Sequence, residues 1–247
     1  MNSNEVALAS VMKKHQINKN HLKMLLKLDS FKIVLILDDS SSMNQIDSPD
    51  TKKSRWKELI AFTRIIIEIT SIFHSDGCDV HFLNSNTVRN VKNVEQLSIY
   101  FNDMPIGVTP LSSTLLNVIK ENPPEKLGLK YLLIIIVTDG EPTDEFGSVN
   151  IKEFKAALQS RPKYCFTSIV ACTNDLNSIS YLDGFDRELE RLDVIDYFKI
   201  EEAKIKAIQG SDFQFTFGDY VTKSILGSII PELDALDEKR LSTSSNS

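Results

Sequence analysis

The stretch KIVLILDDSSS, residues 32–42, passes abruptly from an apolar run to a cluster of carboxyl and hydroxyl side chains. A short β-branched apolar run of this kind predicts a strand that is buried on both faces of a parallel sheet. Similar runs follow along the chain at 80–83, 131–137 and 164–171. Two weaker candidates lie at 87–91 and Asp196–Ile200. We expect the 87–91 strand to lie at an edge of the sheet.

Amphipathic stretches that predict helices lie between these runs, at Lys53–Phe73, Val94–Phe101, Ser112–Glu121, Ile151–Gln159, Leu176–Leu192 and Asp219–Ile230. Strands that alternate with helices predict a Rossmann-like, doubly wound α/β fold with a mostly parallel sheet and helices on both faces. No Pro- or Gly-rich linker divides residues 30–230, which we interpret as one domain. We expect residues 1–29 to form a helical extension. Residues 231–247 are expected to form a C-terminal tail, and its Ser/Thr/Asn-rich end, 241–247, is expected to be disordered.

The composition narrows the class of partner. The 247 residues include 28 Lys and Arg against 34 Asp and Glu, for a net charge of −6. This balance gives no electrostatic reason to bind nucleic acid or an anionic membrane. The longest apolar run is far shorter than the roughly 20 residues of a membrane span, and the N-terminus does not resemble a secretory signal. Three sparse cysteines predict free thiols, and we expect a soluble, cytoplasmic protein.

Polar residues follow two of the predicted strands, at the sheet edge where α/β proteins bind ligands. Asp38, Ser40 and Ser42 alternate along the loop after the first strand, and in an extended turn they would converge on one point. Asp139 follows the 131–137 run, and Thr109 precedes the helix that starts near residue 112. Hydroxyl and carboxylate oxygens are the ligands that Mg²⁺ prefers, although Mn²⁺ or Ca²⁺ would also fit.

Such a ligand set favours binding over catalysis. If hydroxyls contact the ion directly and a carboxylate acts through water, the ion keeps an open position that suits an anionic oxygen. An exposed Asp or Glu of a protein partner would supply that oxygen. The sequence shows no pair of residues that resembles a nucleophile with its base, and we therefore do not expect an enzyme.

These residues resemble the metal-ion-dependent adhesion site of the von Willebrand factor type A domain. The matching segments are Asp38-x-Ser40-x-Ser42, Thr109 in Gly-x-Thr-Pro-Leu, and Thr138-Asp139-Gly140. The resemblance covers roughly residues 31–227 and implies a six-stranded sheet with one antiparallel edge strand. It also implies that Ser40, Ser42 and Thr109 contact the metal, that Asp38 and Asp139 act partly through water, and that the domain binds proteins.

Three further stretches, 82–84, 193–198 and 217–220, resemble a stand-alone intracellular subgroup of this family that is fungal and protist in character. Ser41 departs from the family, which often has Gly before the second Ser. Asp39 is left out of the predicted site, because it is expected to face solvent or the loop backbone.

Two alternatives remain open at this point. A Mg²⁺-dependent phosphatase of the haloacid-dehalogenase type also places an Asp after its first strand, but it needs a second Asp where this chain has Ser40. A purely structural interaction domain without a functional metal is the other alternative. Nucleotide binding is disfavoured, because no Gly-x-Gly-x-x-Gly or phosphate-binding loop follows Leu37.

Overall fold

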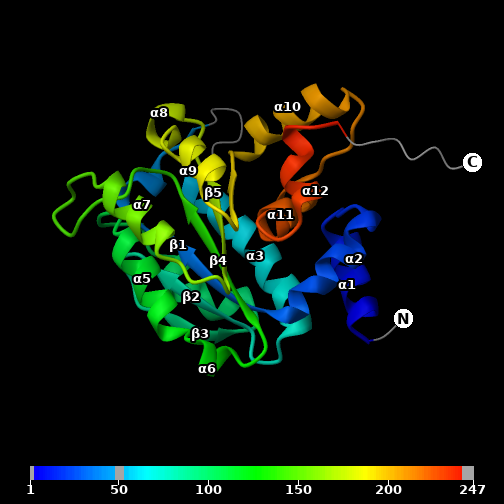
Figure 1. Ribbon diagram of the computed structural model, residues 1–247, viewed down its shortest axis with the longest axis horizontal. Helices are drawn as coiled ribbons and strands as arrows, with labels where there is room; N and C mark the ends of the chain where they lie inside the picture. The colour runs from blue at the N-terminus through cyan, green and yellow to red at the C-terminus, as the bar shows by residue number, and fades with distance from the viewer. Residues whose placement is uncertain (1–2, 48–52, 241–247) are drawn as a thin grey trace, which may run out of the picture.

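The computed structural model describes residues 3–47 and 53–240 (Figure 1). Its six strands are β1 (Phe31–Leu37), β2 (Cys78–Phe82), β3 (Val88–Val91), β4 (Tyr131–Thr138), β5 (Cys165–Ala171) and β6 (Leu192–Ile195). They form one sheet in the order β3-β2-β1-β4-β5-β6. All neighbouring strands are parallel except β2 and β3, which pair antiparallel at the edge. The predicted fold class is therefore confirmed.

The longer helices are α1 (Ser3–Lys14), α3 (Arg55–Phe73), α5 (Leu111–Glu121), α7 (Ile151–Gln159), α9 (Leu182–Glu188), α10 (Phe198–Gln209) and α11 (Phe217–Leu226). Short helices are α2 (Leu22–Leu25), α4 (Ser98–Phe101), α6 (Pro124–Leu127), α8 (Leu176–Ile179) and α12 (Pro231–Asp234). Short 3₁₀ turns are η1 (Lys19–His21), η2 (Leu26–Ser30), η3 (Ser41–Asn44), η4 (Val94–Leu97) and η5 (Ala235–Asp237). Within the described ranges, no helix combines the length and apolar character that a membrane span requires.

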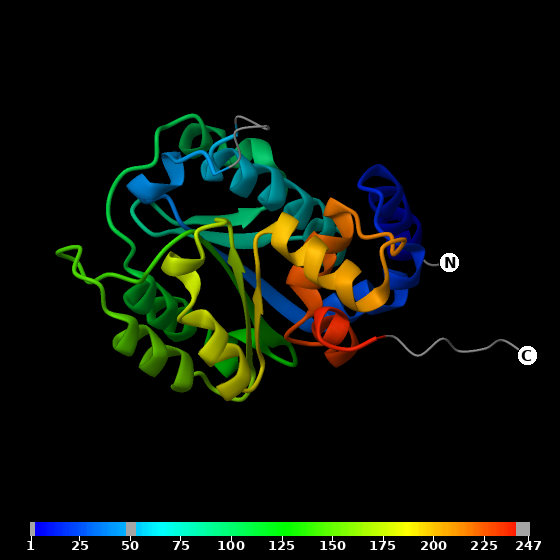
Figure 2. The ribbon, with the colours of Figure 1, turned by 90° about the horizontal axis from the view of Figure 1, so that it is seen from above.

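The central strand β1 contributes to two cores because its side chains alternate between the faces of the sheet. Ile33, Leu35 and Leu37 join the core beneath α1, α3 and α11. Val34 and Ile36 join the core beneath α5, α7 and α9. Figure 2 shows these two helical layers on opposite sides of the sheet. Burial on both faces explains why the β1 run contains no polar residue after Lys32.

The carboxyl ends of β1 and β4 lie together at the centre of the sheet. Leu37 is paired with Phe82 of β2 on one side and with Val137 of β4 on the other. The chain continues from β1 to β2 in one direction, whereas β4 and β5 extend the sheet in the other direction. Their loops therefore meet at the switch point of strand order, where open α/β sheets bind their ligands.

The N-terminal helices pack on the same core as the sheet. Leu8 and Leu28 are fully buried there. The Asn18 backbone N–H donates to Oδ1 of Asp219 in α11 at 2.6 Å. At Gly218 an ideal Cβ would lie 2.2 Å from the carbonyl oxygen of His15, so only glycine permits this approach. The proposed boundary near residue 29 remains a prediction, as does the tail from 231, of which 241–247 lie outside the described residues.

Two predictions of secondary structure at the far edge of the sheet were wrong. The strand expected at Asp196–Ile200 lies instead at Leu192–Ile195, and residues 198–209 form the unpredicted helix α10. The single helix expected over Leu176–Leu192 is divided into α8 and α9. For the strand, the physical reason lies in Asp193, which is buried within β6 although a charged residue is rare inside a strand.

Candidate functional site

Asp38, the first residue after β1, is held between two strand ends. Its side chain is fully buried. Oδ1 accepts a hydrogen bond from the Ser40 backbone N–H at 2.9 Å, and Oδ2 accepts one from the Thr138 hydroxyl at 2.6 Å. Thr138 ends β4, so this contact links the two loops that the sequence analysis placed together. The carboxylate is therefore fixed in orientation before any ligand arrives.

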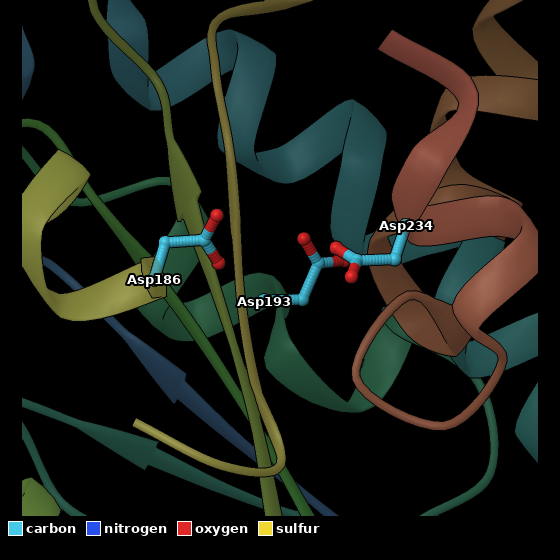
Figure 3. A group of neighbouring side chains, drawn as sticks. All are labelled: Asp186, Asp193 and Asp234. Carbon is cyan, nitrogen blue, oxygen red and sulfur yellow. The ribbon is translucent and has the colours of Figure 1, made fainter. Parts of the chain in front are cut away.

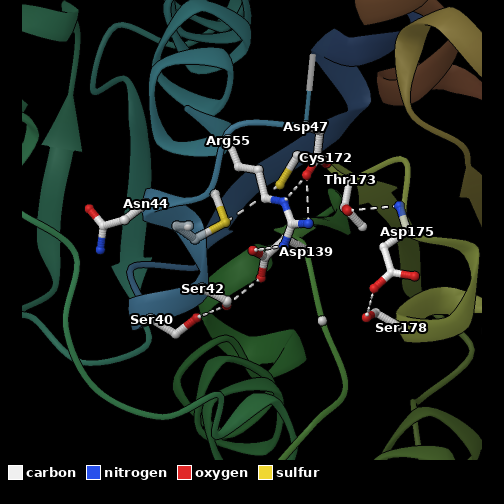
Figure 4. Close-up of polar contacts among 12 residues, drawn as sticks. Ser40, Ser42, Asn44, Asp47, Arg55, Asp139, Cys172, Thr173, Asp175 and Ser178 are labelled. Carbon is white, nitrogen blue, oxygen red and sulfur yellow. Dashed lines mark hydrogen bonds and ion pairs between the residues drawn. The ribbon is translucent and has the colours of Figure 1, made fainter. Parts of the chain in front are cut away.

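Ser40, Ser42 and Asp139 form a connected set of oxygens beside Asp38. The hydroxyl oxygens of Ser40 and Ser42 are 3.1 Å apart, and the Ser42 hydroxyl donates to Oδ1 of Asp139 at 2.8 Å. Figure 4 shows these three side chains pointing toward one another, Ser40 and Ser42 from the start of the η3 turn and Asp139 from the loop just after β4. The structure thus brings four of the five predicted residues into one cluster.

Thr109, the fifth predicted residue, lies on a loop that is tied to the same turn. The backbone N–H of Gly107 donates to the Ser41 hydroxyl at 3.1 Å, and Ser41 N–H donates to the Gly107 carbonyl at 3.3 Å. Thr109 itself is buried, and its backbone N–H donates to the Thr143 hydroxyl at 2.9 Å. The loop is therefore placed beside the cluster, while the hydrogen bonds of Thr109 in the described structure are made by its backbone.

Arg55, the first residue of α3, enters the site from behind Asp139 and was missed by sequence reasoning. It is 5% exposed, and its Nη1 donates to Oδ2 of Asp139 at 2.8 Å. Its Nε and Nη2 both donate to Oδ1 of Asp47, at 2.9 and 2.6 Å. Arg55 therefore holds Asp139 so that Oδ1 faces Ser42. An arginine at the start of an amphipathic helix normally faces solvent, and no sequence signal marks this one as buried.

The electrostatics of the cluster favour a cation. Burial, followed by the nearby charge of Asp139, raises the pKa of Asp38 to about 7, although hydrogen bonds from Ser40 and Thr138 oppose the shift. Burial also opposes ionisation of Arg55, but its hydrogen bonds to Asp47 and Asp139 prevail and raise the pKa of the guanidinium. Two carboxyl groups therefore share a buried site in which, among the described residues, no cation pairs with Asp38. A divalent ion would supply that charge.

The neighbouring acidic residues have other roles. Oδ1 of Asp39 accepts hydrogen bonds from the Asn84 backbone at 2.7 Å and from its side-chain amide at 3.2 Å. Oδ1 of Asp144 accepts from the backbone N–H groups of Phe146 and Ser148, at 2.9 and 2.8 Å. Both carboxylates thus stabilise loops around the cluster. The exclusion of Asp39 from the predicted ligand set agrees with this geometry.

Comparison with known proteins defines the class of fold and goes no further. No family model matches the sequence, and no curated protein matches it. Among solved structures, the chain is similar to a point mutant of the PilB minor pilin from Streptococcus sanguinis, with a TM-score of 0.50 and 10% sequence identity. The match covers 84% of this chain and 62% of the pilin, so the chain spans less than two thirds of that protein. At this identity, the likeness supports the α/β fold alone.

Proposed function

We propose that this protein is a von Willebrand factor type A-like module that holds an acidic side chain of a protein partner through a divalent cation, with Mg²⁺ favoured. The observation that supports this proposal is the connected set formed by Asp38, Ser40, Ser42 and Asp139 at the switch point of the sheet. These oxygens come from two loops that the fold brings together. Thr109 would contribute a further hydroxyl from the third loop.

The chemistry of these groups explains why the ion would recruit an anion. Mg²⁺ binds oxygen ligands in near-octahedral geometry and retains several waters. Serine and threonine hydroxyls are neutral ligands, so they leave most of the charge of the ion uncompensated. A carboxylate from another molecule that displaces one water would restore the balance. The site therefore suits an Asp or Glu side chain on a protein surface.

Arg55 strengthens this argument. Its guanidinium donates a hydrogen bond to Oδ2 of Asp139 at 2.8 Å, so Oδ1 faces Ser42 and the proposed ion. A carboxylate whose charge is shared with a guanidinium compensates a nearby cation less fully. The pairing therefore orients Asp139 and also increases the need of the ion for another anionic ligand. Such outer groups that orient ligands are typical of metal sites.

Calorimetry tests the metal site directly. The full chain is titrated with Mg²⁺, Mn²⁺ and Ca²⁺ after treatment with chelator, alongside Ser42→Ala and Asp38→Ala. Each substitution removes an oxygen from the cluster, and we expect Mg²⁺ binding to be lost or greatly weakened. Ser160→Ala is the matched control, because this exposed serine follows the last turn of α7 and its hydroxyl donates only to the Ala157 carbonyl of that helix. Unchanged Mg²⁺ binding in both variants would show that the assignment is wrong.

A displayed library of random peptides tests the partner chemistry. The immobilised chain is panned with millimolar Mg²⁺, and the bound peptides are then eluted with chelator. We expect enrichment of Asp and Glu, and loss of binding in Ser42→Ala but not in Ser160→Ala. Peptides that bind equally well in chelator would favour a structural domain without a functional metal. Hydrolysis of a generic phosphate ester that Asp38→Asn abolishes would favour the phosphatase instead.

A further inference from the structure

The carboxylates of three residues form an acidic cluster at the edge of the sheet opposite β3. These residues are Asp186, Asp193 and Asp234. They come from α9, β6 and α12, respectively. One oxygen of each lies within 4.8 Å of the others. Figure 3 shows the three side chains converging from separate elements, with the carboxylates facing one another. Two ligands on opposite sides of a Ca²⁺ ion are separated by up to about 5 Å, so this spacing is compatible with a shared ion.

Asp193 is the buried member of the acidic cluster, and its environment is unusual. The residue is 1% exposed, and Oδ2 is inaccessible to solvent with no hydrogen-bond partner among the described residues. An ideal Cβ at position 227 would lie 1.4 Å from this oxygen, so the carboxylate occupies space that only Gly227 provides. A buried carboxylate without a partner is costly. The fold nevertheless accommodates it beside the end of α11.

The buried ammonium group of Lys223 lies near the cluster but also contacts two carboxylates outside it. Lys223 is buried, and its Nζ lies 3.1 Å from Oε1 of Glu201 and 3.2 Å from Oδ1 of Asp237. Burial raises the pKa of Asp193 well above its usual range, and Asp234, Asp186 and Glu201 add to the shift, although Lys223 opposes it. The carbonyl end of α11 adds further negative potential near Gly227. Lys223 is also the main charge that favours ionisation of Asp193, so this one ammonium serves Asp193 as well as Glu201 and Asp237, and a further cation is needed for the three acids of the cluster to be ionised together.

Solvent can reach the cluster from one side. Asp186 and Asp234 are partly exposed. Asp186 also lines an open cleft of about 410 Å³, together with Val194, Asp237 and other residues. The backbone N–H of Val194 donates to Oδ1 of Asp186 at 3.1 Å, which fixes the orientation of this carboxylate. The cluster therefore has one member, Asp186, on the cleft and one member, Asp193, in the interior.

We propose that Asp186, Asp193 and Asp234 bind a hard divalent cation, Ca²⁺ in preference to Mg²⁺, at a site separate from the Ser40–Ser42 cluster. Carboxylate oxygens select such hard cations. Ca²⁺ accepts several carboxylates and up to eight oxygens, whereas Mg²⁺ usually binds one or two carboxylates and keeps its waters. The ion would supply the missing partner of Asp193 Oδ2. It would also join α12, near the C-terminus of the described chain, to α9 and the edge strand β6.

The test measures Ca²⁺ binding and thermal unfolding of the full chain. Wild type, Asp234→Asn and Asp193→Asn are compared in chelator, Ca²⁺ and Mg²⁺. We expect Ca²⁺ to raise the Tm of wild type more than Mg²⁺ does at equal concentration, and this rise to be lost in both variants. Glu232→Gln, an exposed acid on the same helix α12, should keep the full response to Ca²⁺.

A second background separates this site from the site of the proposed function. Ser42→Ala should retain the Ca²⁺-dependent rise in Tm, since Ser42 lies in the other cluster. The inference is overturned if millimolar Ca²⁺ leaves the wild-type Tm unchanged, or if Asp234→Asn responds to Ca²⁺ as wild type does. Asp234 is partly exposed, and its amide variant keeps the test decisive even if Asp193→Asn fails to fold.

Discussion

Replacing Arg55 by methionine would remove the positive charge that lies beneath the candidate metal site. Methionine keeps an unbranched, helix-compatible side chain of comparable length, so the change mainly deletes the guanidinium. The three hydrogen bonds to Asp47 and Asp139, at 2.6–2.9 Å, are lost together. Asp139 is 1% exposed and would remain buried beside Asp38 with the Ser42 hydroxyl as a donor but without its guanidinium partner. The two carboxyl groups would then share the site with no cation paired to either among the described residues.

The expected cost follows from this burial. Removing one partner of a buried ion pair destabilises a protein by about 3–5 kcal/mol, because the remaining charge stays uncompensated. Asp47 is nearer the surface, where water can replace the guanidinium, so most of the cost arises at Asp139. We therefore expect Arg55→Met to lower the free energy of unfolding by about 3–5 kcal/mol in chelator. Asp139→Asn removes the stranded charge, so the double variant should regain part of this loss.

Urea denaturation in chelator and in millimolar Mg²⁺ measures both effects. Arg64→Met is the matched control on α3, because Arg64 is about half-exposed and lies 3.6 Å from an exposed carboxylate of Glu95. Its loss should change the stability by no more than about 1 kcal/mol. If the proposed metal site exists, Mg²⁺ should stabilise Arg55→Met more than wild type, since the ion replaces the missing charge. A loss in Arg55→Met no larger than that in Arg64→Met would refute the reasoning.

Three other predictions test one support of the site and two contacts elsewhere in the fold. Gly107→Ala should lower the free energy of unfolding and weaken Mg²⁺ binding, because φ is +109° and the new Cβ would lie 2.2 Å from the Asn84 side-chain oxygen. Urea denaturation measures the first effect and calorimetry the second. Gly218→Ala should loosen residues 3–30 from α11, since the carbonyl of His15 blocks the Cβ, and hydrogen exchange would report faster exchange there. Burial and then the charge of Lys130 lower the pKa of His74 from 6.5 to about 4. Neutral His74 therefore stabilises the fold above pH 6.5, and this contribution to the free energy of unfolding, at most about 3 kcal/mol, is lost as the pH falls toward 4. His74→Gln should flatten that part of the pH–stability curve.

The two glycine predictions each have a control variant, and the histidine prediction has a contradicting outcome. Gly210→Ala introduces a side chain at φ +118° with no atom within 4 Å, so it measures backbone strain without a clash. Gly210→Ala should therefore lower the free energy of unfolding by less than Gly107→Ala does. Gly184→Ala adds a Cβ on α9 whose nearest neighbour is 3.8 Å away, and hydrogen exchange at residues 3–30 should not change. A pH–stability curve of His74→Gln that matches wild type between pH 6.5 and pH 4 would contradict the third prediction.

The centre of the sheet was predictable because its residues follow simple rules. The β1 and β4 runs are apolar on both faces, and only a strand between two helical layers requires such a pattern. The end of each run is marked by an abrupt change to polar residues. The switch-point rule then places Asp38, Ser40, Ser42 and Asp139 at one edge, and the structure brings their side chains together.

Features that depend on long-range burial could not be predicted in the same way. The predicted helix Lys53–Phe73 begins two residues too early, and nothing in its periodicity distinguishes the buried Arg55 from the exposed Arg64. The strand Leu192–Ile195 contains a buried aspartate, so hydrophobic periodicity shifted the prediction toward the aromatic pair Tyr197 and Phe198. In both places the deciding contact comes from a residue distant in sequence, Asp139 for Arg55 and Gly227 for Asp193.

These two failures share a cause that bears on function. Local pattern, propensity and packing usually agree in a folded protein, and departures from that agreement are expected where a site imposes its own requirements. Arg55 and Asp193 are charged residues that the fold buries at an energetic cost. One lies behind the oxygen cluster at the switch point, and the other lies among three carboxylates at the sheet edge. Because packing alone would favour an apolar side chain at either position, the two buried residues mark these clusters as the places where the proposed ion binding should be tested.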